Sequence, residues 1–299
     1  MKNKKIFYII LVLSIMFANT AVIFTKNALH YGAAPIIIGF YRLSFSALIV
    51  VPFALYKEGF DFLGIKKHDL KFCILGGIFM ACHFACYFSS LVYTNGFIST
   101  ITGALQPIVI AAASFFLFKE KINKNGIFSM GIALIGLFII GLFTFFSAKG
   151  SSSFLGFVIS LFTALFFCAY LLCSRAAIKN MGSYTFLAVL FTVCALTLGI
   201  FAAVTKTPFF GYEKEVYINS FGLCIFCTIM GHAVFNIAVK YVSATVVSVL
   251  NLLGPIFAAF YDFIFFSSKI FSFQIIGGLI IFVGVYFFIK SRESETEKA

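Results

Sequence analysis

The sequence has no tryptophan, five prolines and few acidic residues, since Asp and Glu together number 10 in 299 residues. Charged residues of both signs make up 11% of the chain, which is too little to form the surface of a water-soluble globule. The Gly-x4-Gly-Lys-Ser/Thr pattern of nucleotide-hydrolysing proteins is also missing, so we expect no ATP hydrolysis. The composition therefore excludes a soluble globular protein.

What the chain has instead is long hydrophobic runs, in keeping with 62% hydrophobic residues and a mean hydropathy of +1.08. A helix of about 20 apolar residues crosses the hydrocarbon core of a bilayer, and lipid offers backbone polar groups no partner outside a helix or barrel. We take the first run as a retained helix and not a signal peptide. The sequence predicts an all-α integral membrane protein with ten transmembrane helices, at residues 6–25, 34–56, 72–92, 97–118, 126–146, 154–175, 184–204, 218–238, 243–266 and 272–290.

The net charge of +12 comes mostly from lysines in short loops beside the apolar runs, so it indicates membrane topology and no nucleic-acid partner. With the N-terminus inside, sixteen of the 22 Lys and Arg fall in the inner loops and tails and five in the outer loops. This bias predicts a multi-pass membrane protein with both termini cytoplasmic, most simply in a bacterial inner membrane. Whether it is a monomer or a homodimer is left open.

The second five helices repeat the first five. A shift of 148 residues sets Pro107–Ile122 on Pro255–Ile270 with seven of sixteen positions identical, and a shift of 149 sets Lys26 on Arg175. Two copies of an odd number of helices must lie in opposite orientations across the membrane, which is the plan of many solute carriers. We expect two inverted five-helix repeats, residues 1–148 and 149–299.

These features carry a resemblance to a known family. The chain is similar to the drug/metabolite transporter superfamily, in its EamA-type branch with ten helices, and the resemblance covers essentially the whole sequence. It departs from the family pattern at Ser268, where the second half lacks an acidic residue to match Glu120. The resemblance implies two EamA-like halves and favours export or exchange. The residues that carry it are Arg42, Leu91, Tyr93, Thr94, Pro107 and Lys119–Ile122 in the first half, and Tyr241, Pro255, Gln274, Gly278 and Gly284 in the second.

Arg42 is the one basic residue within a predicted span. A cation in the membrane is costly unless it is paired, reaches the interface or lines water. One interpretation is that its guanidinium binds a substrate carboxylate or phosphate in a central cavity. The other is a structural residue that reaches outward or bonds helix carbonyls.

Two polar pairs lie at corresponding levels of the third and eighth spans: His83 with Tyr87, and His232 with Asn236. Each pair is spaced i to i+4 and so shares a helix face. The inverted repeat predicts that the two faces meet near the midplane, where they would bind a polar solute and could take up a proton. Each histidine could instead be a helix-packing donor.

Gln106-Pro107 and Gly254-Pro255 should each interrupt a helix, because proline removes a backbone hydrogen bond and frees a carbonyl one turn earlier. Such breaks either coordinate solute or act as hinges, and a plain kink is the simpler alternative. Asn19, Gln106 and Asn251 add neutral polar groups, for the cavity or as interhelical bonds.

Asp262 is the one carboxylate that could lie within hydrocarbon, where it could pair with Arg42, gate the exterior, carry a proton or simply be solvated. Glu120 is most simply a local ion-pair partner among Lys119, Lys121 and Lys124. The eight cysteines lie in apolar runs as small hydrophobes, so we expect no metal site and no cofactor.

The leading hypothesis is therefore a secondary transporter, an exporter or exchanger of small polar metabolites that are amino-acid-like or anionic, working by alternating access. Its partners would be a small-molecule substrate and the lipid bilayer. A multidrug exporter of cationic compounds is the alternative within this class, and a channel or membrane scaffold is the alternative outside it. An intramembrane enzyme is disfavoured, because neither a pair of membrane aspartates nor a Ser/His context is present, and we assign no catalytic residue.

Overall fold

The computed structural model describes residues 2–59, 64–93, 96–147, 154–267 and 270–297, and within these ranges all regular structure is helical. Thr94 and Ser268, which belong to the motifs above, lie outside these ranges. The helices are α1 (Lys2–Asn19), α2 (Ala21–His30), α3 (Pro35–Glu58), α4 (Lys67–Tyr93), α5 (Gly96–Phe118), α6 (Lys124–Ser147), α7 (Phe154–Ile178), α8 (Ser183–Val204), α9 (Lys214–Gly222), the π-helix η2 (Leu223–Ala233), α10 (Val234–Ala238), α11 (Ala244–Leu250), the 3₁₀ turn η3 (Asn251–Leu253), α12 (Gly254–Phe266) and α13 (Ser272–Glu297).

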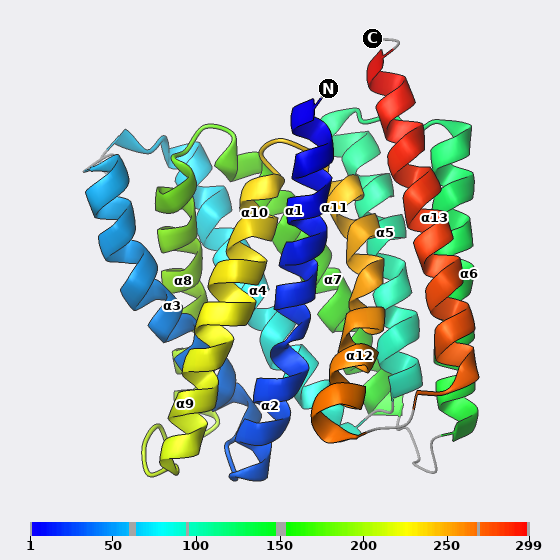
Figure 1. The fold of residues 1–299 in the computed structure, drawn as a ribbon. Coiled ribbons are helices and arrows are strands. Elements are labelled where there is room, and N and C mark those ends of the chain that lie inside the picture. The colour runs from blue at the N-terminus through cyan, green and yellow to red at the C-terminus, as the bar shows by residue number, and fades with distance from the viewer. Residues whose placement is uncertain (1, 60–63, 94–95, 148–153, 268–269, 298–299) are drawn as a thin grey trace.

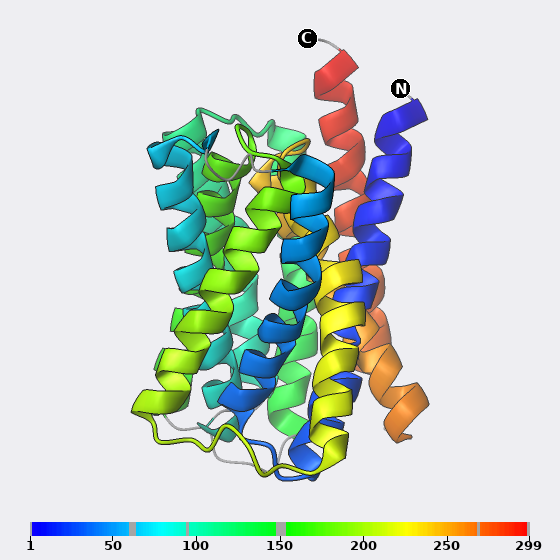
Figure 2. The same ribbon diagram turned by 90° about the vertical axis from the view of Figure 1, so that its left-hand side faces the viewer.

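These elements confirm the predicted membrane architecture. Nine helices of the described residues are long and apolar enough to cross a membrane, and a shorter apolar helix covers residues 105–118. Three spans consist of several elements in a row: α1 with α2, α9 with η2 and α10, and α11 with η3 and α12. The helices run between two end faces, and both chain ends emerge on the same one, called here the termini face (Figures 1 and 2).

Four details differ from the predicted spans. The first span runs on to His30 and is interrupted at Thr20, whose hydroxyl donates to the Phe17 carbonyl at 2.7 Å. The eighth span is π-helical over eleven residues, and the ninth is interrupted by the 3₁₀ turn just before Pro255. The prediction of a break at Pro107 is wrong, because α5 continues through it. A single proline removes one backbone bond, which the packing of α5 on α6 and α7 tolerates.

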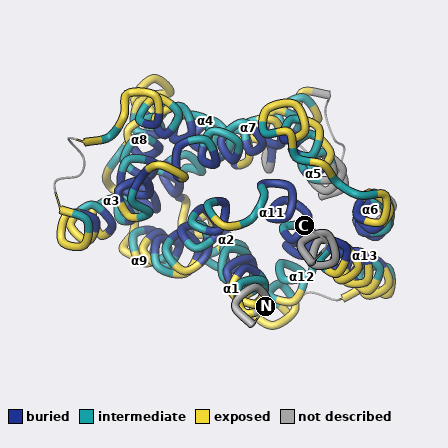
Figure 3. The backbone as a smooth tube through the Cα atoms, turned by 90° about the horizontal axis from the view of Figure 1, so that it is seen from above, coloured by how far each residue is buried: buried dark blue, intermediate teal, exposed yellow. Residues whose placement is uncertain are grey.

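The helices pack as an inverted repeat requires. The second helices of the two halves, α3 and α8, pack on each other, and so do the fifth helices, α6 and α13. The third helix of each half packs on the first helix of the other, as α4 on α7 and as η2 and α9 on α1 and α2. Seen from above, two rows of helices face each other and are joined at their ends by these pairs (Figure 3).

The outer surface of the bundle is apolar, with large exposed side chains such as Leu48, Phe116 and Phe128 distributed over several helices. Buried residues face the interior of the bundle and exposed ones its rim (Figure 3). A soluble protein does not expose apolar area on this scale, whereas acyl chains cover it favourably. The protein is therefore embedded in a lipid bilayer.

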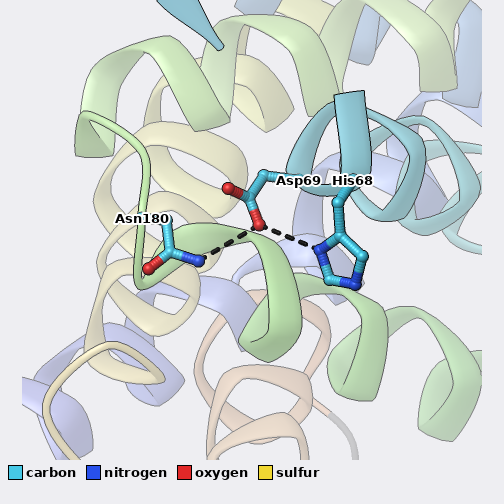
Figure 4. A network of polar contacts seen from close by, with 3 residues as sticks. All are labelled: His68, Asp69 and Asn180. Atoms are coloured by element: carbon cyan, nitrogen blue, oxygen red, sulfur yellow. Dashed lines mark hydrogen bonds and ion pairs between the residues drawn. The ribbon is translucent and has the colours of Figure 1, made fainter. Parts of the chain in front are cut away.

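Two buried or half-buried carboxylates fasten helix ends on the termini face. Asp69, in the first turn of α4 and 2% exposed, accepts a hydrogen bond from Asn180 Nδ2 at 3.1 Å and lies 3.2 Å from His68 Nδ1 (Figure 4). Glu58, at the end of α3, accepts bonds from the backbone amides of Tyr184 and Thr185 at the start of α8. Both carboxylates complement the positive N-terminus of a helix.

Candidate functional site

Two adjoining hollows form one cavity in the interior of the bundle. They have volumes of about 230 and 280 Å³ and share lining residues from both halves, so they are continuous. The first hollow lies between α1, α3, α4, α5, α7 and η2, and the second extends toward α11 and α12. The residues common to both are Asn19, Tyr87, Gly103, Gln106 and Asn251.

Arg42 lines the first hollow from the second turn of α3 and is 3% exposed. Its Nε–H donates to Thr228 Oγ1 at 2.8 Å, and its guanidinium carbon lies 4.8 Å from the centre of the Phe84 ring. Its Nη2 is buried and has no hydrogen-bond partner among the described residues. The anchor at Nε and the ring beneath fix the guanidinium plane and leave one end of the fork for a ligand.

Thr228, which holds Arg42, belongs to the π-helix. The Thr228 hydroxyl donates to the carbonyl of Leu223, five residues earlier, at 3.3 Å. It therefore accepts from Arg42 while its own proton is engaged, which fixes the direction of both bonds. Long π-helices are rare and are concentrated at functional sites.

Both predicted histidines line the same hollow. His83 Nδ1 is 2.9 Å from the Thr163 carbonyl, and since a carbonyl only accepts, His83 Nδ1 carries the hydrogen. The neutral ring then presents Nε2 as an acceptor. His232 lies edge-on to Phe84, with ring centres 5.9 Å apart, and its Nδ1 is buried without a partner among the described residues. Phe84 thus lies between Arg42 and His232.

Proline position relates to the cavity in both halves. Pro107 and Pro255 leave the carbonyls of Gly103 and Asn251 without their usual amide donors, and both of these residues line the cavity. The Asn251 carbonyl accepts instead from the amide of Gly254, which forms the 3₁₀ turn. Nearby, the Asn19 amide donates back to the Ile15 carbonyl at 2.8 Å, which leaves the Asn19 carbonyl oxygen beside the cavity.

The structure brings together seven of the eight residues singled out as substrate-binding candidates: Arg42, His83, Tyr87, Gln106, His232, Asn251 and Asn19. Asn236 is the exception. It is fully buried, lines neither hollow, and its Nδ2 donates to the His232 carbonyl at 2.8 Å. The i to i+4 argument assumed α-helical geometry, whereas His232 closes a π-helical stretch with wider turns.

The two carboxylates have other partners than those expected. Asp262 does not pair with Arg42 but with Lys26, at 2.5 Å between Nζ and Oδ1, near the face opposite the termini. Glu120 forms its ion pair with Arg175 of α7. Both pairs join the two halves of the chain, which sequence neighbours could not indicate.

Several lining residues escaped the sequence argument, notably the aromatic residues Phe84, Phe167 and Phe235 and the hydroxyl residues Ser160 and Thr163. In a chain with 44 phenylalanines, composition offered no signal to choose these. For Thr228, the signal was its position four residues before His232.

The charge balance of the cavity is one-sided. Arg42 is its one charged lining residue within the described part of the chain, and neither hollow is lined by Asp or Glu. Arg42 forms no ion pair with a described carboxylate. No group of three or more His, Cys, Asp or Glu suited to a metal occurs in the part of the chain that the structure describes.

Two inverted five-helix halves around a polar cavity in an apolar bundle define a membrane transporter of the drug/metabolite type. Comparison with known families places the chain more closely: residues 5–142 and 154–290 each match the EamA-like transporter family, to which the protein belongs.

Curated relatives agree with this assignment. The chain is 25% identical over 286 residues to an uncharacterized transporter of Clostridium kluyveri, which covers 93% of this chain and 91% of the relative. It is 23% identical over 331 residues to a WAT1-related protein of Arabidopsis thaliana, covering 97% and 88% of the two chains. It is 21% identical over 250 residues to the uncharacterized transporter YyaM of Bacillus subtilis, covering 82% and 81%.

A protein of known crystal structure has the same fold, with a TM-score of 0.78 over 96% of this chain and 98% of the other, at 17% identity.

Proposed function

We propose that this protein is a secondary transporter, an exporter or exchanger, of small polar anionic metabolites, amino-acid-like carboxylates included, and that it works by alternating access. The observation that carries the proposal is Arg42: a buried guanidinium on the wall of a central cavity, with Nη2 unbonded among the described residues. A carboxylate or phosphate supplies the missing acceptors.

The charge of the cavity favours an anion over a cation. An unpaired guanidinium in a region of low dielectric repels a cationic solute and attracts an anionic one, and the interaction is stronger than in water. The alternative of a cationic-drug exporter needs a buried carboxylate or an uncharged aromatic site. The two hollows contain no lining Asp or Glu and do contain Arg42.

The remaining lining residues suit the rest of a polar solute. The amides of Gln106 and Asn251 offer donors and acceptors, and the imidazole of His232 adds a buried nitrogen without a partner among the described residues. Phe84, Phe167 and Phe235 form apolar walls. The site thus combines one charged anchor with neutral polar groups, as expected of a reversible small-molecule site.

Energy would come from a solute gradient, a proton or the membrane potential. We further propose that both termini lie in the cytoplasm, on the basis of the sixteen-to-five distribution of Lys and Arg, and that the membrane is a bacterial inner membrane. The termini face is then the cytoplasmic face.

The proposal is tested by counterflow in proteoliposomes with a panel of labelled carboxylates, phosphates and organic cations. Arg42→Gln keeps a polar side chain of similar length but loses the charge, and should lower the uptake of the preferred anion at least tenfold. Lys214→Gln, at an exposed position 83% accessible on the opposite face, removes the same charge and should transport normally.

Stimulation of uptake by internal substrate is expected of a carrier and not of a channel. A wild-type protein that accumulates organic cations, or an Arg42→Gln variant with full anion counterflow, would refute the proposed function.

A further inference from the structure

The first helix of each half touches the fourth helix of the other half through one basic side chain. On the termini face, Arg175 near the end of α7 forms an ion pair with Glu120, just beyond the end of α5. Both side chains are largely buried, with exposures of 8% and 14%. The Arg175 guanidinium carbon also lies 4.6 Å from the centre of the Phe118 ring, the last residue of α5.

The opposite face has the same arrangement. Lys26 in α2 pairs with Asp262 in α12, and its Nζ lies 4.8 Å from the centre of the Phe266 ring, the last residue of α12. This pair is more exposed, at 45% for Lys26 and 30% for Asp262.

The two arrangements are related by the internal repeat. The shift of 149 that aligns the first helices sets Lys26 on Arg175, and the shift of 148 that aligns the fourth helices sets Phe118 on Phe266. The residues that follow, Lys119 and Ser267, correspond as well and share a left-handed backbone, with φ of 53° and 52°. The acids do not correspond: Glu120 follows its phenylalanine, whereas Asp262 precedes Phe266 by one helical turn.

The same helices enclose the cavity. The α5–α7 interface contributes Gln106 and Thr163 to its lining, and the α1–α12 side contributes Asn19 and, in the second hollow, Pro255. An ion pair and a cation–aromatic contact at the end of each interface therefore lie on the route between the cavity and that face.

We propose that these two contacts, the termini-face clamp (Arg175, Glu120 and Phe118) and the opposite-face clamp (Lys26, Asp262 and Phe266), close the cavity at its two faces and open one at a time. The inference rests on the proposed alternating access. Because the termini-face clamp is the more buried, breaking it costs more, and the opposite face opens more readily in the protein without solute.

Hydrogen–deuterium exchange of the full chain in lipid nanodiscs, without any solute, tests this mechanism. Glu120→Gln should speed exchange about tenfold at the end of α7 and slow it at the end of α2. Asp262→Asn should do the reverse, with an acceleration of about two- to fivefold at the end of α2, because an exposed pair contributes less.

Glu58→Gln is the matched control. It removes another carboxylate from the termini face, one that binds α8 and not a cavity interface, and should change exchange only at the start of α8. The double variant Glu120→Arg with Arg175→Glu should restore the wild-type pattern, which a requirement for either residue alone would not allow.

The reciprocal response is the decisive readout. If Asp262→Asn, at a half-exposed position that folding tolerates, alters only its own end, or if both ends change in the same direction, the clamps are local staples and the inference is wrong. Reciprocal exchange together with the absence of counterflow for every solute would instead refute the proposed function and leave the two clamps standing.

Discussion

The bond between Arg42 and Thr228 gives the sharpest prediction about the site. In Thr228→Val the side chain keeps its shape and loses the oxygen that accepts from Arg42 Nε at 2.8 Å. The guanidinium, 3% exposed, then has an additional N–H without an acceptor, and Phe84 alone holds its plane. We expect both stability and solute affinity to fall.

The magnitudes follow from the kind of bond that is lost. Hydrogen bonds between neutral side chains inside membrane proteins average about 0.6 kcal/mol, and a charged donor raises this to about 1.5–3 kcal/mol. Most of that loss falls on folding, because the bond is present without solute. A solute must in addition order the released side chain, at about 0.5–1.5 kcal/mol, so its apparent Kd should rise about two- to tenfold.

Two assays separate these effects: thermal unfolding of the purified protein without solute, and the concentration dependence of counterflow. Thr228→Ser keeps the hydroxyl and should restore most of both quantities. Thr197→Val removes a hydroxyl that bonds only the Val193 carbonyl of its own helix, and should leave affinity unchanged. Unaltered affinity in Thr228→Val would show that Thr228 does not orient the guanidinium and would refute this reasoning.

Two further predictions concern the packing of the bundle. In Gly136→Ala, on α6, the added Cβ would lie 2.5 Å from the Gly277 carbonyl oxygen of α13, so the Tm should fall as expected for an overpacking cost of about 1–3 kcal/mol, whereas Gly131→Ala on the same helix meets nothing within 4 Å and should leave the Tm unchanged or raise it. Asp69→Ala removes the acceptor of Asn180 and should lower the Tm by the equivalent of about 1–2 kcal/mol, while Asp69→Asn keeps an oxygen in place and should lose less; equal Tm values for all three proteins would show that the contact of Figure 4 contributes nothing.

The spans and their inverted arrangement could be predicted from sequence because lipid leaves few choices. An apolar run of the right length becomes a helix, and five such runs reverse the orientation of the second half. Most of the cavity followed from the same argument. Polar residues are costly in hydrocarbon, so Asn19, Gln106 and Asn251 were expected to avoid lipid, and the structure places all three on the cavity wall.

What the sequence could not reveal depends on contacts between distant segments. Glu120 is surrounded along the chain by three lysines, yet its partner is Arg175, 55 residues away. Asp262 reaches Lys26 across 236 residues. Hydropathy also carries no information on local helix type, so the π-helix at Leu223–Ala233 and the 3₁₀ turn at Asn251–Leu253 were missed.

The π-helix has a consequence for how this chain tolerates insertions and deletions. An α-helix turns by about 100° per residue, so the loss of one residue ordinarily rotates everything beyond it to a different face. In a π-helical stretch the chain already accommodates more residues per turn, and a single deletion there can return it to ordinary α-helix.

Such a deletion within Leu223–Ala233 would keep the membrane span intact but change the angle between Thr228 and His232, two groups that now face the same cavity region. The length of this short segment, and not only its composition, thus sets the phase of one wall of the site.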